Sequence, residues 1–488
     1  MSALPGLDGW IAAQARFAAA QMLEAISATH LVMERPGFGQ RVIPRPGSVL
    51  ASPVPAHYDP DPDYFFHWFR DAAIVIDALR VALAAGYAEH SAVNRFPEFV
   101  QFGLSLQALV GREFLQRSRL RARVQPGFLQ YLRSDAELSA LSGQAILGDT
   151  RVNADGTPDF IRWSRPQYDG PALEAITLLR WWQQVPELHA HPALQTSVSE
   201  LIRTELAFTL AHVHDASSDI WEEASGYHYY TQLLQAEALR RGADWLEHTG
   251  GRERAAAQRS AAAETLARLD GFWDRSAGFY GSQERSAADD SAPRLDIAVV
   301  LGVLHAGRNT GSHSVLDPKT QATLTALEEF FEARYPINRD RPPGHAPTLG
   351  RYPGDHYYGG GAWFLATLAA AEFYFKLAQA LHGGANLTFA PENSRFRQRL
   401  GADGTAADGA ELARLAIARG DAVMRTVRAY TPEDGALSEQ FDPTTGAPSS
   451  ARHLSWSYAA FITAAASRQL ACRPTPDAVP PVKPAGTA

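Results

Sequence analysis

The feature that most constrains the fold of this chain is an alternation between two kinds of helix. Helix-period hydrophobic runs dominate the sequence, and almost no stretch alternates with a period of two for long. One kind of run is apolar on nearly every side, which is typical of a helix that is buried all round. Runs of this kind span residues 72–85, 172–182, 233–239, 364–377 and 459–465.

The other kind of helix is amphipathic and carries its charged residues on one face. Buried and half-buried helices that alternate along a chain indicate an inner ring surrounded by an outer ring. We therefore predict an all-α fold, the (α/α)6 barrel built from six helical hairpins. The remaining helices are expected at 10–29, 96–116, 194–213, 253–269, 296–306, 318–333 and 408–427, with an irregular segment at 122–166.

The chain has 488 residues, of which 45% are hydrophobic, so it can bury a large core. Length alone would allow roughly two to four domains, but a barrel uses this many residues around one core. We expect one catalytic domain at residues 1–470, followed by a proline-rich, disordered tail at 471–488. The formal net charge is −8 and there is no long basic run, so we expect no nucleic-acid partner.

The single cysteine, Cys472, excludes an intrachain disulfide. Residues 1–9 carry no Lys or Arg and the following helix is interrupted by polar residues, so the N-terminus does not resemble a secretory signal. No uncharged stretch approaches the length of a membrane span. We expect a cytoplasmic monomer without membrane contact, and an unusual export route stays open.

A cluster of aromatic and charged residues precedes each fully apolar helix. The clusters lie at 62–71, 162–171, 219–230, 351–363 and 437–458. If successive inner helices run in the same direction, all five clusters meet at one end of the barrel. In the second cluster, Asp169 is expected to cap the helix that follows, and Pro171 fits its first turn.

Together the clusters have the composition of a sugar-binding site, because aromatic faces can pack on the C–H face of a pyranose. A carboxyl group against such a ring loses solvation, so its pKa rises and it can remain protonated as a general acid. No His/Cys/Asp cluster has metal-ligand spacing and no glycine-rich loop precedes a lysine, so we expect no metal and no cofactor.

Several of these residues also have a purely structural interpretation. Glu222 could be a solvated carboxylate at a helix start, where the helix dipole favours negative charge. Arg70 and Asp71 could form a structural ion pair, and Arg351 could brace its own loop. Trp363 is assigned to the core.

Five stretches carry a resemblance to a known family: PDYFFHWFRD, WSRPQYDGPAL, DIWEEASG, RYPGDHYYGGGAWFLATLAAAE and LSEQFDPTTGAPSSARHLSWSYAA. They resemble the motifs of the glucoamylases, the inverting glucan 1,4-α-glucosidases of glycoside hydrolase family 15, and follow the family's order from about residue 50 to 465. The resemblance implies the same (α/α)6 barrel. It also implies an exo-acting hydrolase that releases β-D-glucose from the non-reducing ends of α-1,4-glucans, such as maltodextrins or fragments of starch or glycogen.

By motif, Glu222 resembles the general acid of the family and Glu439 its general base. Inverting hydrolysis needs both, because one carboxyl protonates the glycosidic oxygen while the other activates water on the opposite face, roughly 6.5–9.5 Å away. Glu222 and its neighbour Glu223 could not bracket a sugar in this way. The resemblance implies substrate binding by Tyr64, Trp68, Arg70, Asp71, Trp163, Trp221, Glu223, Arg351 and Trp456.

Within that set the resemblance implies distinct tasks. Arg70 and Asp71 grip the glucose at the non-reducing end, Trp163 packs beside the acid, and Tyr64 stabilises the oxocarbenium-like transition state. The chain differs from the fungal form of the family, since it has no cysteine pairs, Ser/Thr-rich linker or appended starch-binding domain. Soluble oligo- or polysaccharides are therefore expected as substrates in preference to raw starch.

Three other functions compete with this one. The same barrel could cleave another α-glucoside such as trehalose, isomaltose or dextran, because loops around the outer subsites set that choice. A non-catalytic carbohydrate-binding protein would be expected to lack one carboxylate, and both are present. A phosphorylase would use phosphate in place of water and would not need Glu439 as a base.

Overall fold

Six helices form a closed ring in the computed structural model, which describes residues 6–57, 60–284, 295–402 and 408–473. In order round the ring they are α2 (Phe69–Ala85), α7 (Asp169–Gln184), α9 (Tyr229–His248), α11 (Ala298–Ala306), α14 (Phe364–His382) and α17 (Ser455–Ala471). Each helix packs against the next, and α17 packs against α2, so the ring closes.

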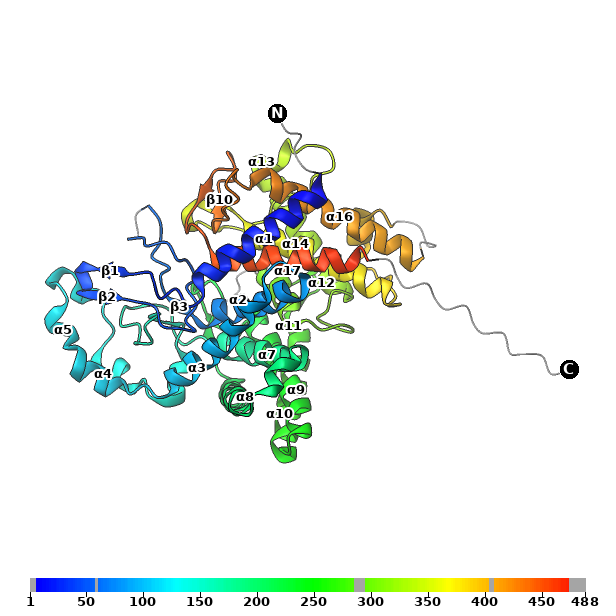
Figure 1. Cartoon of the computed structure of the whole chain (residues 1–488). Coiled ribbons are helices and arrows are strands. Elements are labelled where there is room, and N and C mark those ends of the chain that lie inside the picture. Colours follow the sequence, from blue (N-terminus) through cyan, green and yellow to red (C-terminus); the bar gives the residue numbers. More distant parts are fainter. Residues whose placement is uncertain (1–5, 58–59, 285–294, 403–407, 474–488) are drawn as a thin grey trace.

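A second layer of helices surrounds this ring. It consists of α1 (Leu7–Ala25), α3 (Arg95–Gln107), α8 (Pro192–His212), α10 (Arg252–Leu269), α12 (Pro318–Arg334) and α16 (Gly409–Tyr430). α10 packs on α9 and α16 on α14, while α8 lies against both α7 and α9. Figure 1 shows the first helix, α1, beside the last, α17. The predicted all-α (α/α)6 barrel is therefore confirmed.

The sixth inner helix, α11, was expected among the amphipathic helices, and that expectation is wrong. Every residue of α11 except His305 is buried, and the helix contacts both α9 and α14. Its apolar run is as complete as those of the other inner helices. The sequence pattern placed this helix outside the inner ring because no aromatic cluster precedes its apolar run.

The helix expected at 96–116 is in fact two helices, α3 and α4 (Gly111–Ser118). The chain turns between them, and the Gly111 N–H donates to the Leu141 carbonyl at 2.7 Å. A Cβ on Gly111 would lie 1.8 Å from the Leu138 carbonyl oxygen, so only glycine permits this approach. Short helices also occur within and beside the segment expected to be irregular: α5 (Leu120–Arg123) and α6 (Asp135–Ala140).

The remaining elements are short helices and turns. The helices are α13 (Pro336–Arg339) and α15 (Ser394–Leu400). The 3-10 turns are η1 (Pro36–Phe38), η2 (His90–Asn94), η3 (Pro126–Tyr131), η4 (Gly143–Gly148), η5 (Pro186–Ala190), η6 (Asp270–Phe272) and η7 (Tyr357–Gly359). Among the described residues, no helix is long and apolar enough to cross a membrane.

Very short antiparallel strands tie the loops together. The pairs are β1 (Met33–Arg35) with β2 (Gln40–Val42), β3 (His67–Trp68) with β4 (Arg151–Val152), β5 (Ser217–Ser218) with β6 (Ser225–Gly226), and β7 (Trp273–Asp274) with β8 (Phe279–Tyr280). A three-stranded ladder places β10 (Gln440–Phe441) between β9 (Ala362–Trp363) and β11 (Pro448–Ser449). The ladders β3–β4, β5–β6 and β9–β10–β11 all involve the predicted clusters, so they fix the backbone just before the inner helices.

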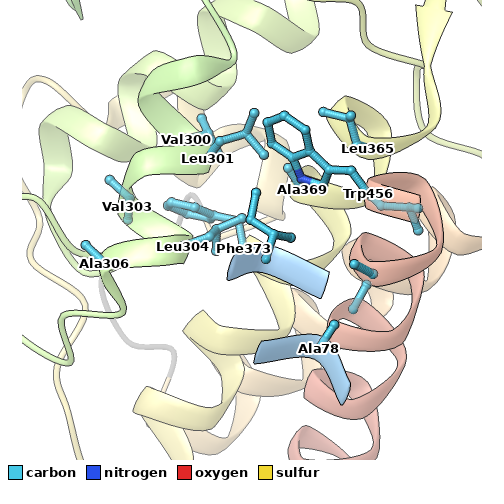
Figure 2. Close-up of a cluster of buried hydrophobic side chains, with 14 of the residues drawn as sticks. Ala78, Val300, Leu301, Val303, Leu304, Ala306, Leu365, Ala369, Phe373 and Trp456 are labelled. Carbon is cyan, nitrogen blue, oxygen red and sulfur yellow. The ribbon is translucent and has the colours of Figure 1, made fainter. Parts of the chain in front are cut away.

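Apolar side chains fill the bore of the barrel below these loops. Figure 2 shows Leu301 of α11, Leu365 and Ala369 of α14 and Trp456 of α17 gathered in one buried cluster. A cavity of about 550 Å³ borders this cluster, because Leu301, Leu365, Ala369 and Trp456 all line it, and it extends to the C-terminal ends of the inner helices. The tail predicted to be disordered lies outside the described residues from position 474 onward.

Candidate active site

One pocket of about 370 Å³ lies where the inner helices begin. The N-terminal ends of α2, α7, α9, α14 and α17 face this same end of the barrel, which brings their clusters together. The pocket is lined by all of the predicted site residues: Tyr64, Trp68, Arg70, Asp71, Trp163, Trp221, Glu222, Glu223, Arg351, Glu439 and Trp456. Their proximity is thus a property of the fold, and their individual roles stay predictions.

Glu222 lies in a tight loop between β5 and β6. The Asp219 N–H donates to the Ala224 carbonyl at 2.9 Å, and the Asp219 carboxylate accepts from the Glu223 N–H at 2.9 Å. Glu222 has a φ of +66°, in the left-handed region that residues other than glycine rarely adopt. A hydrogen bond from the Ser164 hydroxyl to the Glu222 carbonyl helps to hold this conformation.

The Glu222 carboxylate accepts hydrogen bonds from three side chains. Trp68 Nε1 donates to Oε1 at 2.8 Å, Arg70 Nη2 donates to the same oxygen at 3.1 Å, and Trp163 Nε1 donates to Oε2. The Glu222 side chain is only 11% exposed. A carboxylate held by three directed donors is not the solvated helix-start acid of the simpler interpretation.

Arg70, in the first turn of α2, is buried among carboxylates. Besides Glu222, it contacts Asp169 at 3.1 Å and Asp71 at 3.6 Å. Burial raises the pKa of Asp71 to about 6, and the positive charge of Arg70 opposes that rise. The prediction that Asp169 caps the helix is wrong, because Asp169 is the first residue of α7 and its carboxylate accepts from Arg70 instead.

Glu439 stands just before β10 and is only 3% exposed. The pairing of β10 with β9 and β11 brings the Ser450 hydroxyl to Glu439, where it donates to Oε2. Burial raises the pKa of Glu439 to about 7, while the Ser450 hydrogen bond and the charge of Arg351 oppose the rise. Glu439 is thus a buried carboxyl group whose ionised form is disfavoured by burial and favoured by Ser450 and Arg351.

Tyr64 lines the pocket together with the two carboxyl groups. Its hydroxyl is 2.7 Å from the hydroxyl of Tyr357. Burial raises the pKa of Tyr64 well above its usual value, and the negative charges of Glu439 and Glu222 raise it further. Because Glu222 and Glu439 both line the pocket that contains Tyr64, the two carboxyl groups face a common space.

Arg351 links Glu223, in the pocket wall, to Asp355 in the loop that carries Arg351. Its guanidinium reaches Glu223 Oε1 at 2.9 Å and both oxygens of Asp355, at 2.6 and 2.8 Å. The guanidinium carbon also lies 5.2 Å from the ring centroids of Trp221 and Trp363. Arg351 therefore braces its loop and also lines the pocket. Trp363, which was assigned to the core, is buried but belongs to the pocket wall as well.

Asp296 and Ser450 are two contributors that the sequence pattern missed. Trp221 Nε1 donates to both carboxylate oxygens of Asp296, at 3.1 and 3.0 Å, and burial raises the pKa of Asp296 to about 7. An acid directly before the apolar run of α11 was the available signal for Asp296. For Ser450 there was none, because its contact depends on the β10–β11 pairing. Within the described part of the chain, no three His, Cys, Asp or Glu side chains are grouped to hold a metal ion.

Comparison with known proteins places this architecture among characterised relatives. A family model described as "Glycosyl hydrolases family 15" matches residues 39–466. The chain is 29% identical to Glucoamylase 1 of Rhizopus oryzae over 314 residues, which cover 62% of this chain and 52% of that protein. It is 27% identical to an intracellular sporulation-specific glucoamylase of Saccharomyces cerevisiae over 468 residues, which cover 87% and 79%.

Solved structures give the same picture. The family 15 glucoamylase from Hypocrea jecorina superposes with a TM-score of 0.77 at 27% identity, covering 96% of this chain and 74% of that one. The match to the Rhizopus protein spans about half of that protein's length. The matched residues 39–466 contain all five clusters.

Proposed function

Since this chain belongs to glycosyl hydrolase family 15, we propose that it is an exo-acting, inverting hydrolase that releases β-D-glucose from the non-reducing ends of α-1,4-glucans. The observation that carries the proposal is that two carboxyl groups, those of Glu222 and Glu439, line one pocket together with Tyr64. Relatives of the same architecture are named glucoamylases, which supports the choice of substrate.

The form of the pocket supports exo cleavage. Its wall includes Arg70, Asp71 and Trp456, and Trp456 also lines the 550 Å³ cavity deeper in the bore, so this ring stands between the two spaces. A pocket closed at its inner end admits the terminus of a glucan and excludes its middle. Arg70 and Asp71 then bind the hydroxyl groups of the terminal glucose, with Trp456 against its C–H face.

In this proposal Glu222 is the general acid and Glu439 the general base. The departing chain must leave through the mouth of the pocket, so the acid should stand on the mouth side. The Glu222 side chain is 11% exposed and that of its neighbour Glu223 is 37% exposed, whereas Glu439 is 3% exposed. Glu222 donates its proton to the glycosidic oxygen as the bond to the anomeric carbon breaks. Glu439 removes a proton from the water that attacks the opposite face, which yields the β anomer.

The reversed pair of roles is the second candidate, because one observation favours it. Burial raises the pKa of Glu439 to about 7, while the Glu222 carboxylate accepts three hydrogen bonds. Groups that differ in this way often divide the acid and base tasks, with the raised carboxyl as the acid.

A proton NMR time course with maltotriose tests the proposal. The anomeric signal of β-glucose is expected to appear before that of α-glucose, because single displacement at an α linkage inverts the configuration. Early α-glucose would overturn the inverting pair of Glu222 and Glu439. If no glucose appeared, trehalose, isomaltose and dextran would be the next substrates, followed by a binding assay for a non-catalytic role.

Replacing Ser450 by Ala should move the acid limb of the pH–rate profile to higher pH. The Ser450 hydroxyl stabilises ionised Glu439, so its loss raises the pKa of Glu439 further above the ordinary value. kcat/KM requires the ionised base, so activity is then lost earlier as the pH falls. A hydrogen bond to a charged group contributes about 1.5–3 kcal/mol, which corresponds to roughly one pH unit or more.

The measurement is kcat/KM on maltose across the acidic and neutral range. Ser449→Ala, one residue earlier in the chain, is the matched control and should leave the acid limb at the same pH. If Ser450→Ala changed the rate without moving the limb, Glu439 would not be the group that titrates there.

We also propose that the protein works as a monomer in the cytoplasm on soluble maltodextrins. The support for this location is one relative that is named intracellular. Light scattering of the purified protein would reveal a dimer, and fractionation of the source cells would reveal export.

A further inference from the structure

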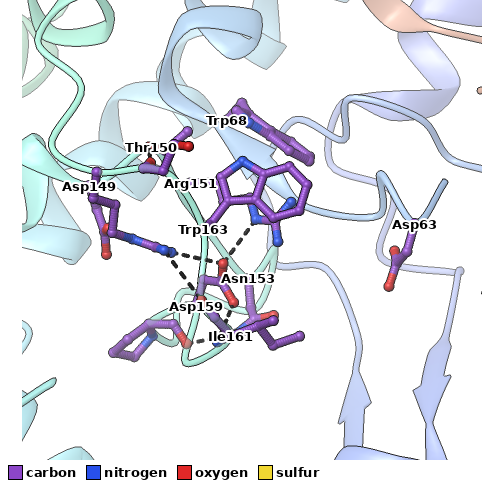
Figure 3. A network of polar contacts seen from close by, with 12 residues as sticks. Asp63, Trp68, Asp149, Thr150, Arg151, Asn153, Asp159, Ile161 and Trp163 are labelled. Atoms are coloured by element: carbon purple, nitrogen blue, oxygen red, sulfur yellow. Dashed lines mark hydrogen bonds and ion pairs between the residues drawn. The ribbon is translucent and has the colours of Figure 1, made fainter. Parts of the chain in front are cut away.

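A buried guanidinium lies against two of the tryptophans that hold Glu222. Arg151 belongs to β4, where it stands opposite Trp68 of β3, and it is fully buried. Its guanidinium carbon is 3.9 Å from the ring centroid of Trp163, 4.6 Å from that of Trp68 and 4.1 Å from that of Phe66. Figure 3 shows Arg151 beside Trp163 and Trp68. One side chain therefore contacts both indoles.

A buried ionic cluster holds Arg151 in this position. Arg151 Nε donates to Asp159 Oδ2 at 2.9 Å, and the same carboxylate oxygen accepts from Arg165 at 2.8 Å. Arg165 also bonds Asp149, which accepts from Arg133 at 2.8 Å. The guanidinium of Arg151 is thus fixed on one edge by Asp159 while its faces are left to the aromatic rings.

The two indoles that Arg151 supports are the two that hold the proposed acid. Trp68 Nε1 donates to one oxygen of Glu222 and Trp163 Nε1 to the other. A shift in either ring would move its N–H away from the carboxylate, since the indole is rigid and its N–H direction follows the ring plane. The contacts run from Arg151 through the two rings to both oxygens of Glu222.

We propose that Arg151 is a positioning residue for Glu222, acting through Trp68 and Trp163. This inference rests on the proposed function of Glu222 as general acid. An arginine suits the task because its planar face can stack on rings while its edge is bound by a carboxylate. A lysine would keep the charge beside Asp159 but has no planar face to hold the rings.

The test compares two substrates of Arg151→Lys. Maltose needs a proton on its departing sugar, whereas α-glucosyl fluoride releases fluoride with little help from an acid. We expect kcat on maltose to fall about 10- to 100-fold, because small displacements of a catalytic group have costs of this size. We expect kcat on α-glucosyl fluoride to stay within about threefold of the wild type, since this reaction needs little help from the acid that Arg151 positions.

Arg133→Lys is the matched control, because Arg133 is a buried arginine of the same cluster that bonds Asp149 and the Asp159 carbonyl. Its ratio of maltose to fluoride activity should equal that of the wild type. If Arg151→Lys does not fold, Asp159→Asn is the second variant. It keeps the arginine but removes the charge that fixes it, and should lower the same ratio less strongly.

The outcomes separate this inference from the proposed function. A wild-type protein inactive on both substrates would remove the proposed function. An active wild type, with Arg151→Lys losing both activities equally or losing neither, would overturn the positioning role alone. Thermal unfolding of each variant shows whether an equal loss comes from reduced stability.

Discussion

Replacing Glu222 by Gln is expected to lower kcat on maltotriose by about 10²–10⁴-fold, because an amide cannot donate a proton to the glycosidic oxygen. The variant should still bind maltotriose, since Gln keeps the shape of the side chain and can still accept a hydrogen bond from Trp68 or Trp163. On α-glucosyl fluoride the same variant should retain most of the wild-type rate. Steady-state kinetics on the two substrates measure both effects.

Two further variants make this result specific. Glu439→Gln should lose activity on maltotriose and on the fluoride alike, because both reactions need a base to activate water. Glu223→Gln is the matched neighbour of Glu222 and should act mainly on KM, as expected of a ligand for substrate hydroxyls that bonds Arg351. If Glu439→Gln kept the fluoride activity and Glu222→Gln lost it, the roles would be reversed.

Replacing Arg70 by Met is expected to destabilise the protein as well as to abolish activity. Arg70 lies within hydrogen-bonding or ion-pair distance of Asp71, Asp169 and Glu222, and its side chain is 4% exposed. Without Arg70, three carboxyl groups remain in a buried site with no cation between them. Removing one partner of a buried ion pair costs about 3–5 kcal/mol, which would lower the thermal unfolding midpoint by several degrees.

The loss from Arg70→Met should be larger at neutral pH than in acid. Burial already raises the pKa of Asp71 to about 6, above its value in the unfolded chain. A carboxyl group with a raised folded-state pKa contributes less stability as the pH rises from the unfolded pKa through the folded one. Removing Arg70 strengthens this effect, so the variant should approach wild-type stability as the carboxyl groups take up protons.

Thermal unfolding of the wild type, Arg70→Met and Arg70→Lys at acidic and neutral pH checks this prediction. The Lys variant keeps the charge and should recover much of the stability. It should not recover activity, because one ammonium group lacks the fork geometry that reaches several carboxylates at once. An Arg70→Met protein as stable at neutral pH as the wild type would show that water compensates these carboxylates.

The barrel could be predicted because each inner helix carries its own signal. A run that is apolar on every side, such as that of α14, must be buried on every side, and burial of this kind has few architectures available to it. The exception, α11, has the same run but no aromatic cluster before it. Its place in the ring was therefore decided by packing between α9 and α14.

The candidate residues could be predicted because their chemistry is local, as with the adjacent Glu222 and Glu223 between aromatic residues. Their partners could not, because these are distant in the chain. Trp221 bonds Asp296, 75 positions away, and Trp163 bonds Glu222, 59 positions away. Asp169 shows the same limit, since local rules favour a helix cap and a buried arginine at position 70 overrides them.

The pattern of side chains along the chain thus settles which helices are buried and which residue types gather before them. The tertiary structure decides how those residues face one another. The +66° φ of Glu222 and the Ser450 hydroxyl on Glu439 depend on the strand pairings β5–β6 and β10–β11, and the Arg151 guanidinium against two indoles depends on the pairing of β3 with the distant strand β4. Helix periodicity is a local property, whereas orientation within a pocket is the sum of contacts between segments that meet only when the ring closes.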